Sequence, residues 1–125
     1  MHWSKAPAEL VSFLEEAARD VDESQKRMMF GFPAYFINGN MFMAAHQENL
    51  ILRLRHTDRE AFLSSGDGFA RFEPMAGRVM KEYVVVPKRV YVDRTRFHTL
   101  LGKSTEYVRG LPAKGQRAPG GPAEK

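Results

Sequence analysis

The chain has 125 residues, of which 43% are hydrophobic, and this is enough for one domain with a modest core. It contains no cysteine, so disulfides and thiol chemistry are excluded, and a zinc site would need histidine and carboxylate ligands. The formal net charge is +4, and the basic residues are spread along the chain instead of forming the clustered patch that dedicated nucleic-acid binders carry. Because no apolar run approaches the roughly 20 residues of a membrane span and no signal-peptide pattern opens the chain, we expect a cytoplasmic protein without membrane contact.

The first predicted element is an amphipathic helix over residues 6–21. Leu10, Leu14 and Val21 recur at the spacing of one helical stripe, and the charged residues lie mostly outside that stripe. A polar linker over residues 22–26 follows.

The stretch from Met28 to Arg55 predicts a three-stranded antiparallel meander. Asn38-Gly39 is its strongest turn signal, because both residues tolerate the positive φ of a two-residue type I′ hairpin. That turn places Tyr35 opposite Phe42, and a second turn is expected around Gln47-Glu48.

Alternation of side chains along this register sorts the meander onto two faces. The first face is wholly apolar and is predicted to be the main core: Phe32, Ala34, Phe36, Met41, Met43, Ala45, Leu50, Leu52 and Leu54. The second face is mixed, and such a face is either covered by the last helix or used for contact. Its predicted contact residues are Tyr35, Ile37, Phe42, Ile51, Arg53 and Arg55.

After the meander, Thr57 and Glu60 fit a capping box that opens a short helix over residues 58–64. Two strands are predicted over residues 69–73 and 80–86, the second of them strongly β-prone.

A last helix is predicted over residues 94–109, with Asp93 as its N-cap. From Pro112 the composition turns to Pro, Gly, Lys and Ala, which predicts a folded domain over residues 1–111 and a disordered tail over residues 112–125. The element order αβββαββα clusters its strands, and this favours an α+β fold with an antiparallel sheet.

Two sequence blocks carry a family resemblance. The first runs from Met29-Phe30-Gly31 through Asn38-Gly39-Asn40-Met41-Phe42 to Leu50-Ile51-Leu52-Arg53, and the second runs from Phe72 to Pro87. In this order they resemble the TfoX N-terminal domain family, from the first helix to about Leu111. The resemblance implies an α+β fold like that of secretion chaperones, without catalytic residues. TfoX and Sxy proteins regulate natural competence as transcriptional co-activators beside a cyclic-AMP receptor protein, which makes a DNA-linked role the alternative for this chain.

No residue set in the sequence predicts a catalytic, cofactor or metal site. His46, His56 and His98 lack ligand spacing and are interpreted as surface or capping residues. Arg78 and Lys81 are weak candidates for an anion site, and an enzyme or small-ligand binder would use Arg78 as a clamp and Glu82 as a base.

The favoured hypothesis is therefore a non-enzymatic regulatory or protein-interaction domain. Its predicted partner is another protein or a second copy of the chain. Tyrosine, phenylalanine and arginine side chains on the mixed face support this hypothesis, because protein interfaces are enriched in these residues. Nucleic acid is the weaker alternative, since it would use aromatic side chains for stacking and arginines for phosphates.

Overall fold

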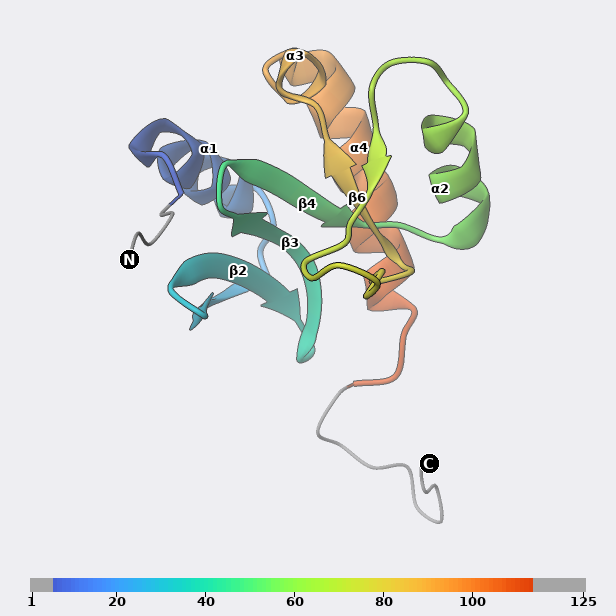
Figure 1. The fold of residues 1–125 in the computed structure, drawn as a ribbon. Coiled ribbons are helices and arrows are strands. Elements are labelled where there is room, and N and C mark those ends of the chain that lie inside the picture. Colours follow the sequence, from blue (N-terminus) through green and yellow to red (C-terminus); the bar gives the residue numbers. More distant parts are fainter. Residues whose placement is uncertain (1–5, 114–125) are drawn as a thin grey trace.

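Residues 6–113 are described by a computed structural model, in which strands and helices form two layers (Figure 1). The helices are α1 (Ala8–Arg19), α2 (His56–Leu63), α3 (Lys88–Tyr91) and α4 (Arg94–Arg109). The strands are β1 (Gln25–Met29), β2 (Phe32–Ile37), β3 (Asn40–His46), β4 (Asn49–Arg53), β5 (Ala70–Arg71) and β6 (Tyr83–Val86). They form one antiparallel sheet in the order β1-β2-β3-β4-β6-β5, which confirms the predicted α+β class.

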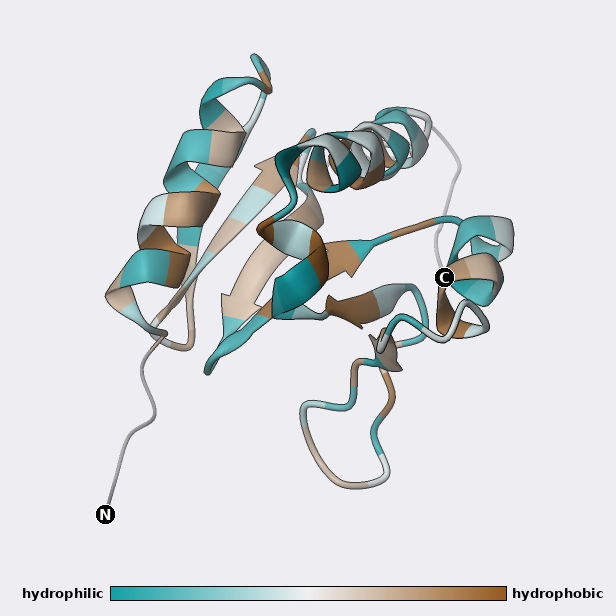
Figure 2. Ribbon diagram, turned by 90° about the horizontal axis from the view of Figure 1, so that it is seen from above, coloured by the Kyte–Doolittle hydropathy of each residue, from teal (hydrophilic) through white to brown (hydrophobic). Residues whose placement is uncertain are grey.

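Helices α1 and α4 cover one face of this sheet, which we call the inner face, and the loop between β5 and β6 projects from the opposite, outer face (Figure 2). The α1 stripe buries Leu10 and Leu14, as its spacing predicts. Helix α4 begins where predicted, since the Asp93 carboxylate accepts a hydrogen bond of 3.2 Å from the Arg96 amide. No helix within residues 6–113 is long and apolar enough to cross a membrane.

The predicted turns of the meander are confirmed. Asn38 and Gly39 both have positive φ, at 52° and 79°, and they join β2 to β3. His46 pairs with Asn49, so Gln47-Glu48 is a two-residue turn between β3 and β4. Strand β1 is an addition to the prediction, because the polar composition of its first residues was interpreted as a linker.

The missed strand β1 pairs with β2 through a turn at Phe30 and Gly31. Their φ values are 54° and 83°, so this turn also lies in the left-handed region. Phenylalanine is a rare residue there, because its Cβ crowds the backbone. Gly31 is therefore the one residue whose type favours a turn here, and from the sequence it predicts an interruption of a single strand.

A β-bulge on β3 overturns the predicted faces of β2. Counted from the turn, the second pair is Phe36 with Met41 as predicted, but Tyr35 pairs with Met43 instead of Phe42. Phe42 is the extra residue, and one extra residue moves every side chain beyond it to the other face. Consequently four residues of the predicted core face lie on the outer face, while three of the predicted mixed face lie in the core. The four are Phe32, Ala34, Phe36 and Met41, and the three are Tyr35, Ile37 and Phe42.

The bulge leaves backbone carbonyls of β3 without ladder partners, because the pairing of β3 with β4 begins at Met43. Side chains satisfy them. The fully buried Ser104 hydroxyl of α4 donates to the Phe42 carbonyl at 3.1 Å, and Arg53 donates to the Met41 carbonyl at 3.4 Å. Helix α4 is thus fixed to the sheet at the point where the ladder is irregular.

Two further predictions are corrected, for the start of α2 and for the length of β5. The predicted capping box does not form: α2 begins two residues earlier than expected, with Arg55 as its N-cap and no side-chain cap. The predicted strand over residues 69–73 is reduced to the two residues of β5. Residues 114–125 lie outside the described residues, so the disordered tail stays a prediction.

Candidate functional site

The outer face of the sheet is the candidate binding surface, because α1 and α4 cover only the inner face. Directly opposed residues of antiparallel strands point to the same face. The register therefore places a continuous apolar row across five strands, which is made of Ala34, Ala44, Ile51, Val85 and Ala70.

Three aromatic rings extend this row toward the ends of the strands. The His46 ring lies between Phe32 and Phe72, with centroids 5.4 Å and 5.2 Å away. Phe72 is the first residue of the loop between β5 and β6, and it is buried. The rings therefore connect the β1–β2 hairpin to that loop, and His46 serves as a packing residue.

The exposed large apolar side chains of the outer face lie at the two ends of this aromatic connection. We call them the apolar rim; its members are Met29 (40% exposed), Phe30 (92%), Met75 (64%), Val79 (42%) and Met80 (39%). Met29 is paired with Phe32, and Met80 donates its amide to the Phe72 carbonyl at 2.9 Å. Exposed apolar residues on one side of a molecule mark candidate interaction sites, and methionine adapts to partners of different shape.

Cations stand beside the apolar rim. Arg27 of β1 lies over the Phe36 ring, with its guanidinium carbon 4.9 Å from the centroid. Arg78 and Lys81 are both exposed in the loop between β5 and β6. The candidate surface is therefore apolar with a basic border.

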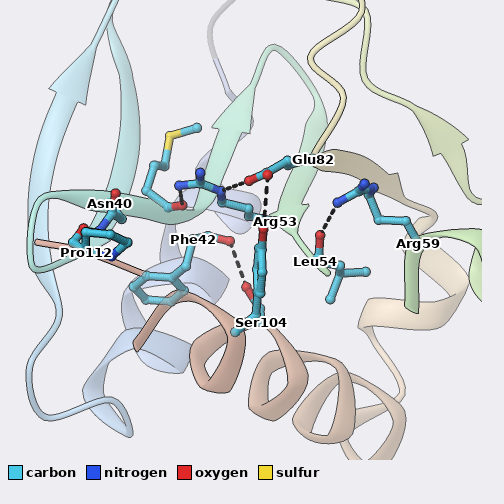
Figure 3. A network of polar contacts seen from close by, with 10 residues as sticks. Asn40, Phe42, Arg53, Leu54, Arg59, Glu82, Ser104 and Pro112 are labelled. Atoms are coloured by element: carbon cyan, nitrogen blue, oxygen red, sulfur yellow. Dashed lines mark hydrogen bonds and ion pairs between the residues drawn. The ribbon is translucent and has the colours of Figure 1, made fainter. Parts of the chain in front are cut away.

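A polar network closes one end of the outer face, where β4, β6 and α4 meet (Figure 3). Arg53 Nε donates to Glu82 Oε1 at 2.7 Å, and the Tyr107 hydroxyl donates to Glu82 Oε2 at 3.0 Å. The Arg53 guanidinium also lies 5.5 Å from the Tyr83 ring centroid. Both oxygens of the carboxylate are thus engaged by donors of the chain itself.

The electrostatics of this network keep Glu82 ionised. Burial raises the pKa of Glu82, but hydrogen bonds from Arg53 and Tyr107 outweigh it and hold the pKa below the ordinary value. Burial, with the hydrogen bond to Glu82, raises the pKa of Tyr107. At neutral pH the network is therefore a carboxylate between a guanidinium and a neutral phenol, an arrangement suited to joining elements.

The predicted contact face of six residues is not a single surface. Tyr35 is 3% exposed, and Ile37 and Phe42 are fully buried in the core under the helices, so these three are wrong as contact residues. The bulge at Phe42 is the physical reason. The predicted contact face is not formed by its other three members, which are Ile51, Arg53 and Arg55.

Ile51 and Arg53 do lie on the outer face, as the β4 part of the register predicts, but Ile51 is only 2% exposed. Arg53 is half-buried in the polar network. Arg55 is exposed and lies beyond β4, with its guanidinium 5.7 Å from the Tyr107 ring centroid. From the sequence, Met29, Met75 and Met80 stay open as members of an adaptable binding surface, whereas Phe30 and Val79 carry no such prediction; the structure leaves all five exposed.

The contacts of Arg78 and Glu82 do not bring the two side chains together, as an enzyme site around them would require. Arg78 lies in an exposed turn, where Met75 and Arg78 form an isolated bridge, whereas Glu82 faces Arg53 and Tyr107. Within residues 6–113, no three His, Cys, Asp or Glu side chains converge as metal ligands would.

A cleft of about 430 Å³ lies between α1 and α4, on the helical side of the molecule. Its floor includes Phe13 and Phe97, and its rim includes Glu16, Arg94 and His98. Arg94 and Glu16 approach each other to 3.9 Å, so charges of opposite sign meet across the cleft.

Comparison with known proteins gives one match. Residues 16–107 match the family model described as the TfoX N-terminal domain, and they include every strand, the last turn of α1 and most of α4. No curated protein and no solved structure matches the chain significantly.

Proposed function

This chain belongs to the TfoX N-terminal domain family, and from that premise we propose that it is a cytoplasmic protein-interaction domain in a regulatory role, which binds its partner through the apolar rim. The observation that carries this proposal is the one-sided cover of the sheet. Met29 pairs with Phe32 on the face that α1 and α4 leave open, and Met75, Val79 and Met80 belong to the loop that projects from that face. An apolar surface bordered by cations is the pattern of a protein interface, with an apolar centre and a polar border.

The proposal is non-enzymatic because the network at Glu82 holds parts of the fold together instead of presenting a free base. Both carboxylate oxygens accept hydrogen bonds from the chain, and a general base needs a lone pair available to a substrate proton. Binding energy in such a domain comes from the exposed methionines and Phe30, which become desolvated when a partner docks.

The experiment compares a double variant of the rim, Phe30→Asp with Met75→Asp, against Val92→Asp. Val92 is a matched control, since it is 53% exposed and follows α3 on the helical side. We expect partners retained by the wild type from a cell lysate to remain with Val92→Asp and to be lost with the double variant. All three proteins should unfold at the same urea concentration within error, because none of these side chains is part of the core.

Self-association is measured in parallel by sedimentation of the purified chain. A dimer that dissociates in the double variant but not in Val92→Asp identifies the partner as a second copy. Identical partner lists and identical sedimentation for all three proteins would contradict the proposal.

DNA-linked regulation is the second candidate, and the exposed cations beside the rim favour it. Arg27, Arg78 and Lys81 would contact phosphates while Phe30 of the rim stacks on a base. This candidate predicts binding to duplex DNA that falls steeply with salt and weakens when Lys114 and Arg117 are neutralised. Absent or salt-insensitive binding in a fluorescence anisotropy titration would remove it.

A further inference from the structure

The two edges of the sheet differ, and the difference points to a second binding site. At one edge, β5 has only two residues, and α2 lies beside its neighbour β6. At the other edge, β1 has five residues, all exposed, and no strand within residues 6–113 pairs with its outer side. An open edge of this length is a template for one more strand.

The turn geometry identifies which backbone groups of β1 face outward. In a two-residue hairpin with positive φ at both turn residues, the flanking pair exchanges both backbone hydrogen bonds, and here that pair is Met29 with Phe32. Bonded and non-bonded pairs alternate along the ladder. Gln25, Arg27 and Met29 therefore bond to β2, whereas the N–H and C=O groups of Lys26 and Met28 point to solvent.

Pro33 agrees with this assignment. It stands opposite Met28, where the β2 residue sends no backbone bond toward β1, so its missing N–H costs this ladder nothing. The open edge thus offers two N–H donors and two C=O acceptors at Lys26 and Met28, which suits an extended chain.

The charged side chains of β1 do not stand in front of this edge. Lys26 turns to the inner face and binds Glu15 of α1 at 3.0 Å. Arg27 turns to the outer face and lies over Phe36. Both leave the backbone accessible. Arg27 places positive charge on one side of the position that an added strand would occupy, and on the other side the Lys26 ammonium, which binds Glu15, keeps further N–H donors.

Those charges discriminate between occupants. A second copy that pairs symmetrically through the Lys26 backbone would place Arg27 opposite Arg27, or Lys26 opposite Lys26, and like charges directly opposed on neighbouring strands are destabilising. A strand with carboxylates at two adjacent positions would meet Lys26 on one face and Arg27 on the other, because side chains alternate.

We propose that the open edge of β1 binds an extended acidic segment of a partner protein, which adds a seventh strand to the sheet through the Lys26 and Met28 backbone. The site shares β1 with Met29 of the apolar rim, but it uses outward backbone groups and does not depend on the role of the rim. Backbone bonds supply the affinity, and the two cations supply the preference for acidic sequence.

The probe is a short capped peptide of alternating threonine and valine with a central Glu-Glu pair, and its control carries Lys-Lys instead. Amide hydrogen exchange of the full chain is followed by NMR. In the free protein, the Arg27 amide should exchange slowly and the Lys26 and Met28 amides fast. The acidic peptide should slow exchange at Lys26 and Met28 by about tenfold, and the basic peptide should leave it unchanged.

Two variants test the two parts of the site. Met28→Pro removes only an outward N–H and should weaken acidic-peptide binding about tenfold, whereas Met28→Thr, which keeps that N–H, should bind as the wild type does. Arg27→Glu keeps the backbone and should shift preference toward the basic peptide, so the proposal remains testable if the proline variant does not fold.

Three outcomes would overturn the proposal. One is no protection at Lys26 and Met28 with peptide in excess, and another is equal binding of the acidic and basic peptides. The third is protection that appears without peptide and rises with protein concentration, which would make a second copy the occupant. The rim variant Met75→Asp should bind the acidic peptide unchanged, so failure at the rim is distinguished from failure at the edge.

Discussion

The inner and outer faces of the sheet are built from the same two hairpins, yet only one of them is a core. On the inner face, α1 and α4 bury Phe42, Leu50 and Leu52 completely. On the outer face, a short apolar row is covered in part by a loop, and Phe30 and Met75 remain mostly exposed. Apolar composition is thus similar on the two faces, and the position of the helices decides which one stabilises the fold and which one is available for binding.

The largest expected effect comes from Phe42, the extra residue of the bulge. Phe42→Ala should lower the free energy of unfolding by about 3–5 kcal/mol, because it removes a fully buried ring and leaves a cavity beneath α4. Phe30→Ala is the matched change on the outer face and should alter stability by no more than about 0.5 kcal/mol. Urea unfolding followed by circular dichroism measures both. Equal losses would mean that Phe30 is also buried in solution.

A smaller loss is expected at Ser104, which satisfies the bulge carbonyl. Ser104→Ala should cost about 1–3 kcal/mol, since the Phe42 carbonyl is left buried without a donor. Thr99→Ala is the control; its hydroxyl bonds locally to Thr95 at an exposed site of the same helix, and its loss should change stability by no more than about 0.5 kcal/mol. If both variants unfold at the same urea concentration, the bulge carbonyl does not depend on Ser104.

The smallest of these stability effects belongs to the partly exposed network at Glu82. Glu82→Gln should cost about 1 kcal/mol at pH 7, because two charge-assisted hydrogen bonds weaken while solvent screens the pair. The pKa of Glu82 is lower in the folded chain than its ordinary 4.5, so its stabilisation is complete above that value and is lost as pH falls through the folded-state pKa.

Urea unfolding at a series of pH values tests this sign. The gap between wild type and Glu82→Gln should be constant from pH 7 down to about pH 5 and should close in more acidic solution. A gap that widens on acidification would show that the carboxylate is protonated in the folded chain.

Much of the fold follows from local sequence signals. The Asn38-Gly39 turn, the Asp93 cap and the stripe of α1 all depend on residues close together in the chain, and each is confirmed. The faces of β4 are also as predicted, since their register is fixed by a turn with no bulge between. The candidate site was not predictable to the same extent, because its position depends on pairing between distant residues.

The family, the α+β class and the turns at Asn38-Gly39 and Gln47-Glu48 follow from the sequence alone, because they depend on residue type and short-range geometry. Which residues meet solvent depends on pairing between distant parts of the chain. One extra residue at Phe42 inverted β2, since strand side chains alternate with a period of two and the bulge adds one. The Phe42 carbonyl accepts a hydrogen bond from Ser104, which lies 62 positions further along the chain, so no pattern within the meander predicts this contact.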